Sequence, residues 1–132
     1  MIYIKLFLVS FATFLLLDAL WLGLIARSFY AKHLSLYLTD NVLWSSAFIF
    51  YVIFNVGLLV FVILPSIEKN SYQSLVLYSL LYGLVTFATY DLTNLATIKD
   101  WPIIVSLIDI MYGMFVALVS ASAAFYMNKY FI

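Results

Sequence analysis

Four long apolar stretches constrain this chain more than any other feature. They cover residues 6–25, 42–64, 72–94 and 102–127. Each is long enough for a helix to cross a hydrocarbon core of roughly 30 Å. Backbone polar groups inside a bilayer must be paired within the segment, and the alternating pattern of a barrel strand is missing. The sequence therefore predicts an all-α polytopic membrane protein, a four-transmembrane-helix bundle with both termini on one side.

The composition agrees with a chain whose surface meets lipid. Of its 132 residues, 67% are hydrophobic and only 9% are charged, whereas soluble domains are about half apolar and about a quarter charged. The first stretch is predicted to be a retained span rather than a signal peptide, because Asp18 interrupts it and no small-residue cleavage site follows. We expect residues 1–132 to form one transmembrane domain whose main partner is the lipid bilayer.

Charge and cysteine content exclude several classes of function. Six basic residues balance six acidic ones, so there is no basic surface for nucleic acid. The chain has no cysteine and a single histidine, His33, which argues against thiolate, zinc and haem sites. We therefore expect no metal site built from these ligands and identify no cofactor. His33 is interpreted as an interfacial side chain.

Lysine and arginine do not settle the orientation of the bundle. Basic residues in short loops favour the cytoplasmic side, and here they divide equally. Lys5, Lys69 and Lys129 are predicted on the side of the termini, and Arg27, Lys32 and Lys99 on the other. The tie permits either orientation, and it also permits insertion both ways round as an antiparallel homodimer.

The connection between the first two stretches, residues 27–41, shows helical spacing of its own. Its apolar residues Tyr30, Leu34, Tyr37 and Leu38 alternate with Lys32, Ser35 and Asp40. This pattern predicts a short amphipathic helix over residues 30–38, lying flat in the membrane interface. Helix caps are predicted at residues 39–41 and at Asn70 and Ser71, and a helix start at Pro102.

Three acids interrupt the apolar stretches: Asp18, Asp91 and Asp109. Ionisable residues inside a membrane are costly and mark ion paths, proton relays or ligand sites. Counted along the helices at 1.5 Å per residue, all three lie roughly 10 to 14 Å from the same membrane edge. Because they come from three helices, a compact bundle is expected to gather them around one polar cavity. The alternative is that each acid only bridges two helices, above all Asp91, which lies near a helix end within reach of water.

Other polar and small residues accompany these acids. The third stretch carries a polar stripe that should avoid lipid, and the fourth carries small residues that allow close helix packing. Trp21, one turn from Asp18, offers an indole N–H donor, and Asn55 is assigned to helix packing. The stripe is Thr86, Tyr90, Thr93 and Thr97 beside Asp91 and Asn94, and the seam is Ser106, Asp109, Gly113, Val116 and Ser120.

No lysine or arginine lies inside the apolar stretches to neutralise the acids. Each carboxyl must then be protonated, hydrogen-bonded to Asn94, Tyr90, Tyr112 or a threonine, or paired with a bound cation. We predict that at least one of the three is neutral at pH 7, and that the three titrate as a coupled set.

Four short segments resemble a family of small bacterial four-span membrane proteins of unknown function. They are Leu-Asp-Ala-Leu-Trp-Leu-Gly at 17–23, Tyr-Asp-Leu-Thr-Asn at 90–94, Lys-Asp-Trp-Pro at 99–102 and Asp-Ile-Met-Tyr-Gly at 109–113. The resemblance implies a multi-pass protein of the bacterial cytoplasmic (inner) membrane. It implies no reaction and no catalytic residue.

Three functions remain open. The first is binding or transport of a small molecule or ion with proton coupling, through Asp18, Asp91, Asp109, Asn94, Trp21, Tyr90 and Tyr112. The second is a membrane-embedded enzyme or enzyme accessory in lipid modification, since paired carboxylates can act as general acid and base or hold Mg²⁺. The third is a structural or assembly subunit of a membrane complex. The ligand would be a small molecule, a cation or a lipid.

Overall fold

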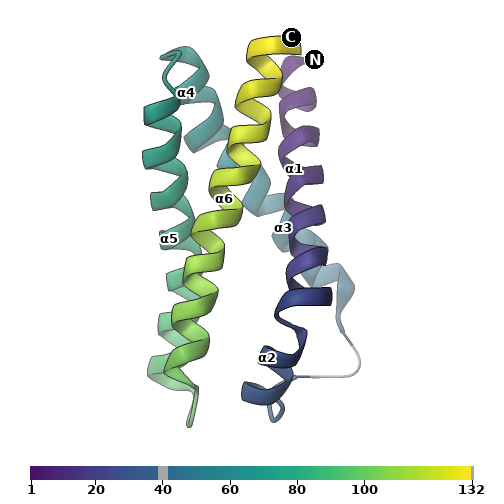
Figure 1. Ribbon diagram of the computed structural model, residues 1–132, viewed down its shortest axis with the longest axis vertical. Helices are drawn as coiled ribbons and strands as arrows, with labels where there is room; N and C mark the ends of the chain where they lie inside the picture. Colours follow the sequence, from purple (N-terminus) through teal and green to yellow (C-terminus); the bar gives the residue numbers. More distant parts are fainter. Residues whose placement is uncertain (39–41, 132) are drawn as a thin grey trace.

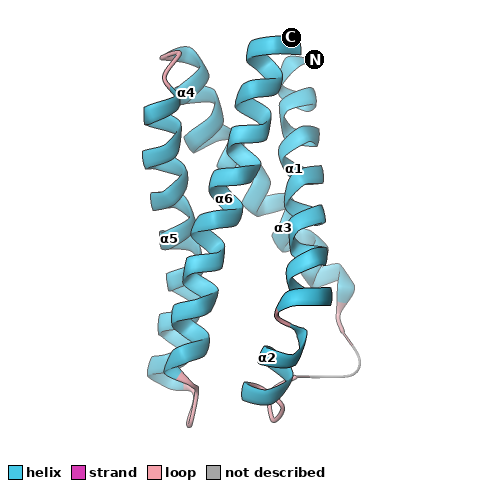
Figure 2. Ribbon diagram, viewed as in Figure 1, coloured by secondary structure: helices cyan, strands magenta, loops and turns pink. Residues whose placement is uncertain are grey.

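The computed structural model describes residues 1–38 and 42–131. These residues form helices joined by short turns (Figures 1 and 2). The elements in chain order are α1 (Ile2–Leu20), η1 (Trp21–Ile25), α2 (Arg27–His33), α3 (Trp44–Leu58), η2 (Leu59–Ile63), α4 (Leu64–Glu68), α5 (Tyr72–Thr97) and α6 (Ile103–Phe131). The all-α prediction is confirmed.

Four continuous helical segments are long and apolar enough to cross a membrane, which confirms the predicted number of spans within the described residues. The first begins four residues before its apolar stretch, and the other three end three or four residues after theirs, because residues beyond an apolar stretch can continue the backbone hydrogen bonding of the helix into the head-group region. The segments are Ile2–Ile25, Trp44–Glu68, Tyr72–Thr97 and Ile103–Phe131.

Two of the spans contain a π-helical turn. In η1 the Ala26 amide donates to the Trp21 carbonyl five residues earlier, at 2.7 Å, instead of four. η2 forms a similar turn between α3 and α4. Single π-helical turns inside α-helices occur frequently at functional sites, and η1 begins at Trp21, three residues after Asp18.

Both chain ends lie at the same end of the bundle (Figure 1). The turn between α4 and α5 lies at that end too, and there Ser71 caps α5 by accepting a hydrogen bond from the Ser74 amide at 3.1 Å, as predicted. The short helix α2 and the turn between α5 and α6 lie at the opposite end. The predicted caps at residues 39–41 lie outside the described residues.

The predicted short helix between the first two spans is present, but it begins and ends earlier than its amphipathic pattern indicates. α2 ends at His33, and the chain then turns. Leu34 is buried against Trp101 and Val105, and the Tyr37 hydroxyl donates to the Lys99 carbonyl. Packing against the turn between α5 and α6 therefore replaces the second half of the predicted helix. Its orientation in the interface stays a prediction.

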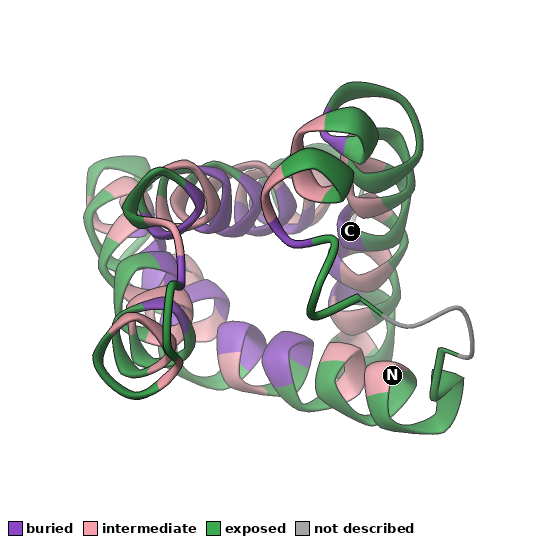
Figure 3. Ribbon diagram, turned by 90° about the horizontal axis from the view of Figure 1, so that it is seen from below, coloured by how far each residue is buried: buried purple, intermediate pink, exposed green. Residues whose placement is uncertain are grey.

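The core lies between the helices, and the outward faces are apolar. Figure 3 shows the buried residues on the inward sides of the helices. Phe14, Leu58 and Val116 belong to this core, while many large apolar side chains, such as Leu16 and Ile53, are exposed. An exposed apolar surface of this extent is the surface that a bilayer covers. The protein is a multi-pass membrane protein.

Glycines allow α5 and α6 to pack closely against each other. A Cβ at Gly83 would lie 2.5 Å from the Gly113 carbonyl oxygen, and a Cβ at Gly113 would lie 2.2 Å from the Phe87 ring. Ser106, Val116 and Ser120 on the same α6 seam are buried. The small-residue seam thus packs closely as expected, and it brings Asp91 on α5 and Asp109 on α6 to the same region.

Candidate functional site

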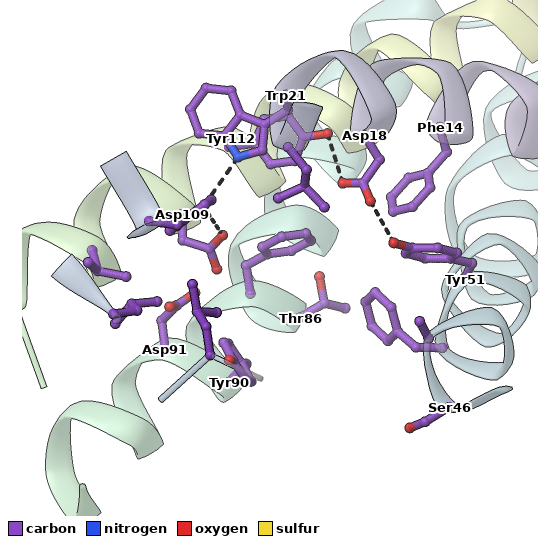
Figure 4. Close-up of a pocket in the computed structure, with 18 of the residues that line it drawn as sticks. Phe14, Asp18, Trp21, Ser46, Tyr51, Thr86, Tyr90, Asp91, Asp109 and Tyr112 are labelled. Atoms are coloured by element: carbon purple, nitrogen blue, oxygen red, sulfur yellow. Dashed lines mark hydrogen bonds between the residues drawn. The ribbon is translucent and has the colours of Figure 1, made fainter. Parts of the chain in front are cut away.

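A cavity of about 590 Å³ opens between the helices, and all three acids line it. Figure 4 shows Asp91 and Asp109 toward one end of this cavity and Asp18 toward the other. The rest of its lining is mainly aromatic and aliphatic. The lining residues are Phe14, Asp18, Trp21, Leu22, Tyr30, Leu34, Leu38, Leu43, Ser46, Ala47, Phe50, Tyr51, Thr86, Phe87, Tyr90, Asp91, Trp101, Val105, Asp109 and Tyr112. Among the described residues, no lysine, arginine or histidine lines it.

Asp18 on α1 accepts hydrogen bonds from two tyrosines on two other helices. The Tyr51 hydroxyl of α3 donates to it at 2.7 Å, and the Tyr112 hydroxyl of α6 donates at 3.2 Å (Figure 4). Tyr112 was one of the donors expected from the sequence. The two phenol donors hold Asp18 in a fixed position and give each of its carboxyl oxygens a hydrogen-bond partner.

Asp109 on α6 accepts one hydrogen bond, from the Tyr30 hydroxyl of α2 at 2.8 Å. Tyr30 in turn accepts a hydrogen bond from the Trp21 indole at 3.2 Å. Burial, followed by the adjacent Asp109 carboxyl, raises the pKa of Tyr30 above its ordinary range. The Tyr30 hydroxyl therefore keeps its proton and remains a donor to Asp109 at neutral pH.

Asp91 on α5 is fully buried, and neither carboxyl oxygen has a hydrogen-bond partner among the described residues. Its burial is notable because Asp91 lies close to the end of the helix, where the sequence pattern allowed solvent access. Trp101 and its neighbours fold over the end of α5: the Trp101 indole donates to the Ser106 hydroxyl at 3.0 Å, and that hydroxyl donates to the Asp91 carbonyl at 2.9 Å. Asp109 is close enough for the two carboxyls to interact.

The stacked rings of Trp21 and Tyr112 connect the two hydrogen-bonded acids. Their centroids are 4.5 Å apart, with an angle of 10° between the planes. The Trp21 indole donates to Tyr30, which donates to Asp109, and the Tyr112 hydroxyl donates directly to Asp18. The side chains of Asp18 and Asp109 are therefore connected through hydrogen bonds and packed aromatic rings.

A second cavity of about 470 Å³ is lined in part by the same two rings. It is almost wholly apolar and borders side chains that are exposed on the outer surface of the bundle. Its lining residues are Leu17, Leu20, Trp21, Ile25, Ile108, Met111, Tyr112 and Phe115. Trp21 and Tyr112 thus line both the acid-lined cavity and this apolar cavity.

Of the remaining predicted site residues, some line the cavity and one does not. Tyr90 lines the acid-lined cavity, although 58% of its surface is exposed, and its ring packs edge-on against Trp101. Trp21 also lines the cavity, but its indole donates to Tyr30 rather than to an acid. Asn94 is partly buried and does not line the cavity. Whether any of these residues binds a ligand or a proton stays a prediction.

The threonine stripe on α5 only partly faces inward. Thr86 lines the cavity, whereas Thr93 and Thr97 are exposed. Each of the three hydroxyls donates to the carbonyl four residues earlier on the same helix. A threonine whose hydroxyl is satisfied in this way can face lipid, which is why the stripe did not mark the inward side.

The acids do not form a compact metal site. Within residues 1–38 and 42–131, no group of three or more histidine, aspartate or glutamate side chains could hold a metal ion together. Asp18 is the acid set apart, at its own end of the cavity. The cavity therefore offers one pair of carboxyls and one separate carboxyl on an aromatic wall rather than a cluster of three oxygen ligands.

Two tyrosines in this network were missed from the sequence. Tyr30 was assigned to the amphipathic connection. Tyr51 lies within an apolar span that has no acid close to it along the sequence. One signal pointed to Tyr51: Asn55 lies four residues later on the same face and donates from its amide to the Tyr51 carbonyl at 2.9 Å. Polar residues at this spacing in a membrane helix indicate an inward face.

Comparison with known families gives a match over nearly the whole chain. The family described as "Predicted membrane protein (DUF2177)" matches residues 3–126. The chain belongs to this family. The resemblance inferred from the four short segments is thereby confirmed. No curated protein and no solved structure matches the chain.

Proposed function

We propose that the protein binds a small molecule or ion in the acid-lined cavity and exchanges it for protons, transporting it across the membrane. One observation supports this most strongly. Three carboxyls from three different helices line one cavity whose described lining contains no basic residue. Their charge must then be balanced by protons or by a bound cation.

The three acids differ in a way that suits exchange. Asp18 and Asp109 each accept tyrosine hydrogen bonds, while Asp91 accepts none among the described residues. A buried carboxylate without donors is costly, so Asp91 favours the neutral form until a cation replaces its proton. Ligand and proton would then compete for the same oxygens, and binding should weaken as pH falls.

The cellular setting is part of the proposal. The segments shared with small bacterial membrane proteins favour the bacterial cytoplasmic (inner) membrane. The equal numbers of lysine and arginine at the two ends fit a homodimer with subunits inserted in opposite directions. A lipid is a further possible ligand, since the second cavity is apolar and borders exposed apolar residues.

Proteoliposomes carrying a pH-sensitive dye inside test the exchange. An imposed pH gradient is challenged in turn with Na⁺, K⁺, Mg²⁺ and benzyltrimethylammonium, and the rate of its collapse is followed. At least one of these should accelerate the collapse with wild-type protein, and Asp91→Asn should remove the effect. Asp100→Asn is the matched control, because Asp100 is an exposed turn residue with φ 62°, a conformation that asparagine tolerates. If the pH gradient collapsed at the same rate with each of the four probes as without any probe, proton coupling to all of them would be contradicted.

A further inference from the structure

We infer that the ligand of the acid-lined cavity is an organic monocation with an apolar body, a lipophilic ammonium, whose charged group lies at Asp91 and Asp109. This inference rests on the proposed function and specifies its ligand. It depends on the size of the cavity, the unused acceptors on its wall and the aromatic rings around them.

The size of the cavity favours an organic ligand. A volume of about 590 Å³ lies within the typical range for small-molecule sites, roughly 300 to 1,000 Å³. A bare metal ion would need several oxygen ligands converging on one point, and the described residues provide no such group. A ligand that fills this space must extend across apolar lining such as Phe14, Phe50 and Phe87.

The unused hydrogen-bond acceptors place the charged group. Asp18 has donors on both oxygens, from Tyr51 and Tyr112. Asp109 has a donor on one oxygen only, and fully buried Asp91 has none among the described residues. Asp91 lines the cavity and is adjacent to Asp109. The carboxyl oxygens that lack hydrogen-bond donors are therefore concentrated at Asp91 and Asp109, and a positive group should bind there.

The aromatic lining of the cavity also favours a cationic ligand. Cations bind to the faces of tryptophan and tyrosine rings, and quaternary ammonium groups are bound by aromatic cages. The Tyr90 and Trp101 rings line the same cavity as Asp91 and pack edge-on against each other, and the Tyr30 hydroxyl donates to Asp109. Anions are excluded by the acids, and a sugar would leave many hydroxyl groups unpaired against an apolar wall.

Charge balance fixes the exchange step. When the ammonium binds, the proton on Asp91 leaves to solvent and the resulting carboxylate pairs with the cation. No covalent bond of the ligand is formed or broken. Binding should therefore release protons.

Calorimetry on purified full-length protein in detergent tests this with two probes of the same shape. Benzyltrimethylammonium carries the charge, and neopentylbenzene replaces its nitrogen with carbon. We expect the ammonium to bind and the neutral probe to bind at least about tenfold more weakly. Asp91→Asn and Asp109→Asn should each weaken ammonium binding at least about tenfold, Asp18→Asn should weaken it less, and Asp100→Asn should leave it unchanged. Asp109→Glu, which keeps the charge, should bind better than Asp109→Asn and separates loss of charge from loss of fold.

Each result has a distinct meaning. Equal binding of both probes, or binding of neither, overturns the ammonium inference. A loss at Asp18 equal to that at Asp91 overturns the placement of the charged group. Ammonium binding without proton release, measured in two buffers of different ionisation enthalpy, supports the ligand class but contradicts the proton exchange of the proposed function.

Discussion

Asp91 is the residue whose surroundings differ most from what its position along the chain indicates. It is fully buried and has no hydrogen-bond partner among the described residues, although its neighbours along the helix include exposed residues. An ionised carboxylate cannot remain in such surroundings without a partner. The carboxyls at Asp18 and Asp109, by contrast, have tyrosine donors in place.

We therefore expect Asp91 to be the neutral acid in the unliganded protein. Infrared spectra at pH 7 should show a protonated carboxyl C=O band that disappears in Asp91→Asn and persists in Asp18→Asn. Adding benzyltrimethylammonium should reduce the band in wild-type protein, because the cation displaces the proton. A band that survives Asp91→Asn would assign the proton to another acid.

The sequence identified the acids but not most of their donors. Three carboxyls in apolar stretches are visible without a structure, because each is costly in lipid, and their shared cavity followed from counting residues along the helices. Tyr30 and Tyr51 were not visible as donors because tyrosine is common both at membrane interfaces and in cores. Its pairing with an acid depends on how helices rotate against each other.

At the scale of the elements, the spans were predictable and the connection between the first two was not. Apolar length alone indicates a membrane helix, so the four spans required no knowledge of packing. α2 was predicted to continue to Leu38 because its pattern is amphipathic. In the structure α2 ends at His33, because Leu34 is buried against Trp101, a residue far away along the sequence.

The contact between α5 and α6 gives a prediction with an internal control. In Gly83→Ala the new methyl group meets the α6 backbone at Gly113. Separation of the helices should lower the free energy of unfolding by about 1–3 kcal/mol. Gly23→Ala should change it little, because nothing lies within 4 Å of a Cβ at that position. Thermal unfolding in mild detergent measures both variants. Equal stability of the two variants would show that the close packing of α5 on α6 carries no energetic constraint.

At the scale of the whole molecule, both chain ends lie at one end of the bundle and the turn at Lys99 lies at the other. The chain has no cysteine, so single cysteines report position without background. Ile2→Cys and Phe131→Cys should react with an impermeant maleimide from the same side of sealed vesicles, and Lys99→Cys from the opposite side.

The same labelling tests the proposed antiparallel dimer. If subunits insert both ways, every one of these positions should be labelled to about half, because each exposes its cysteine outward in only one of the two subunits. Labelling of Ile2→Cys and Phe131→Cys from different sides in a uniformly oriented population would contradict the fold.

The paired rings of Trp21 and Tyr112 bear on where a solute would come from. They line both the acid-lined cavity and an apolar cavity bordered by exposed Met111 and Phe115. Hydrocarbon is a reservoir that already concentrates lipophilic solutes relative to water. A solute entering past these rings would be drawn from that reservoir, and its apparent affinity would follow its lipid–water partition coefficient. Two amines of equal intrinsic affinity would then be captured in proportion to how much of each the membrane holds.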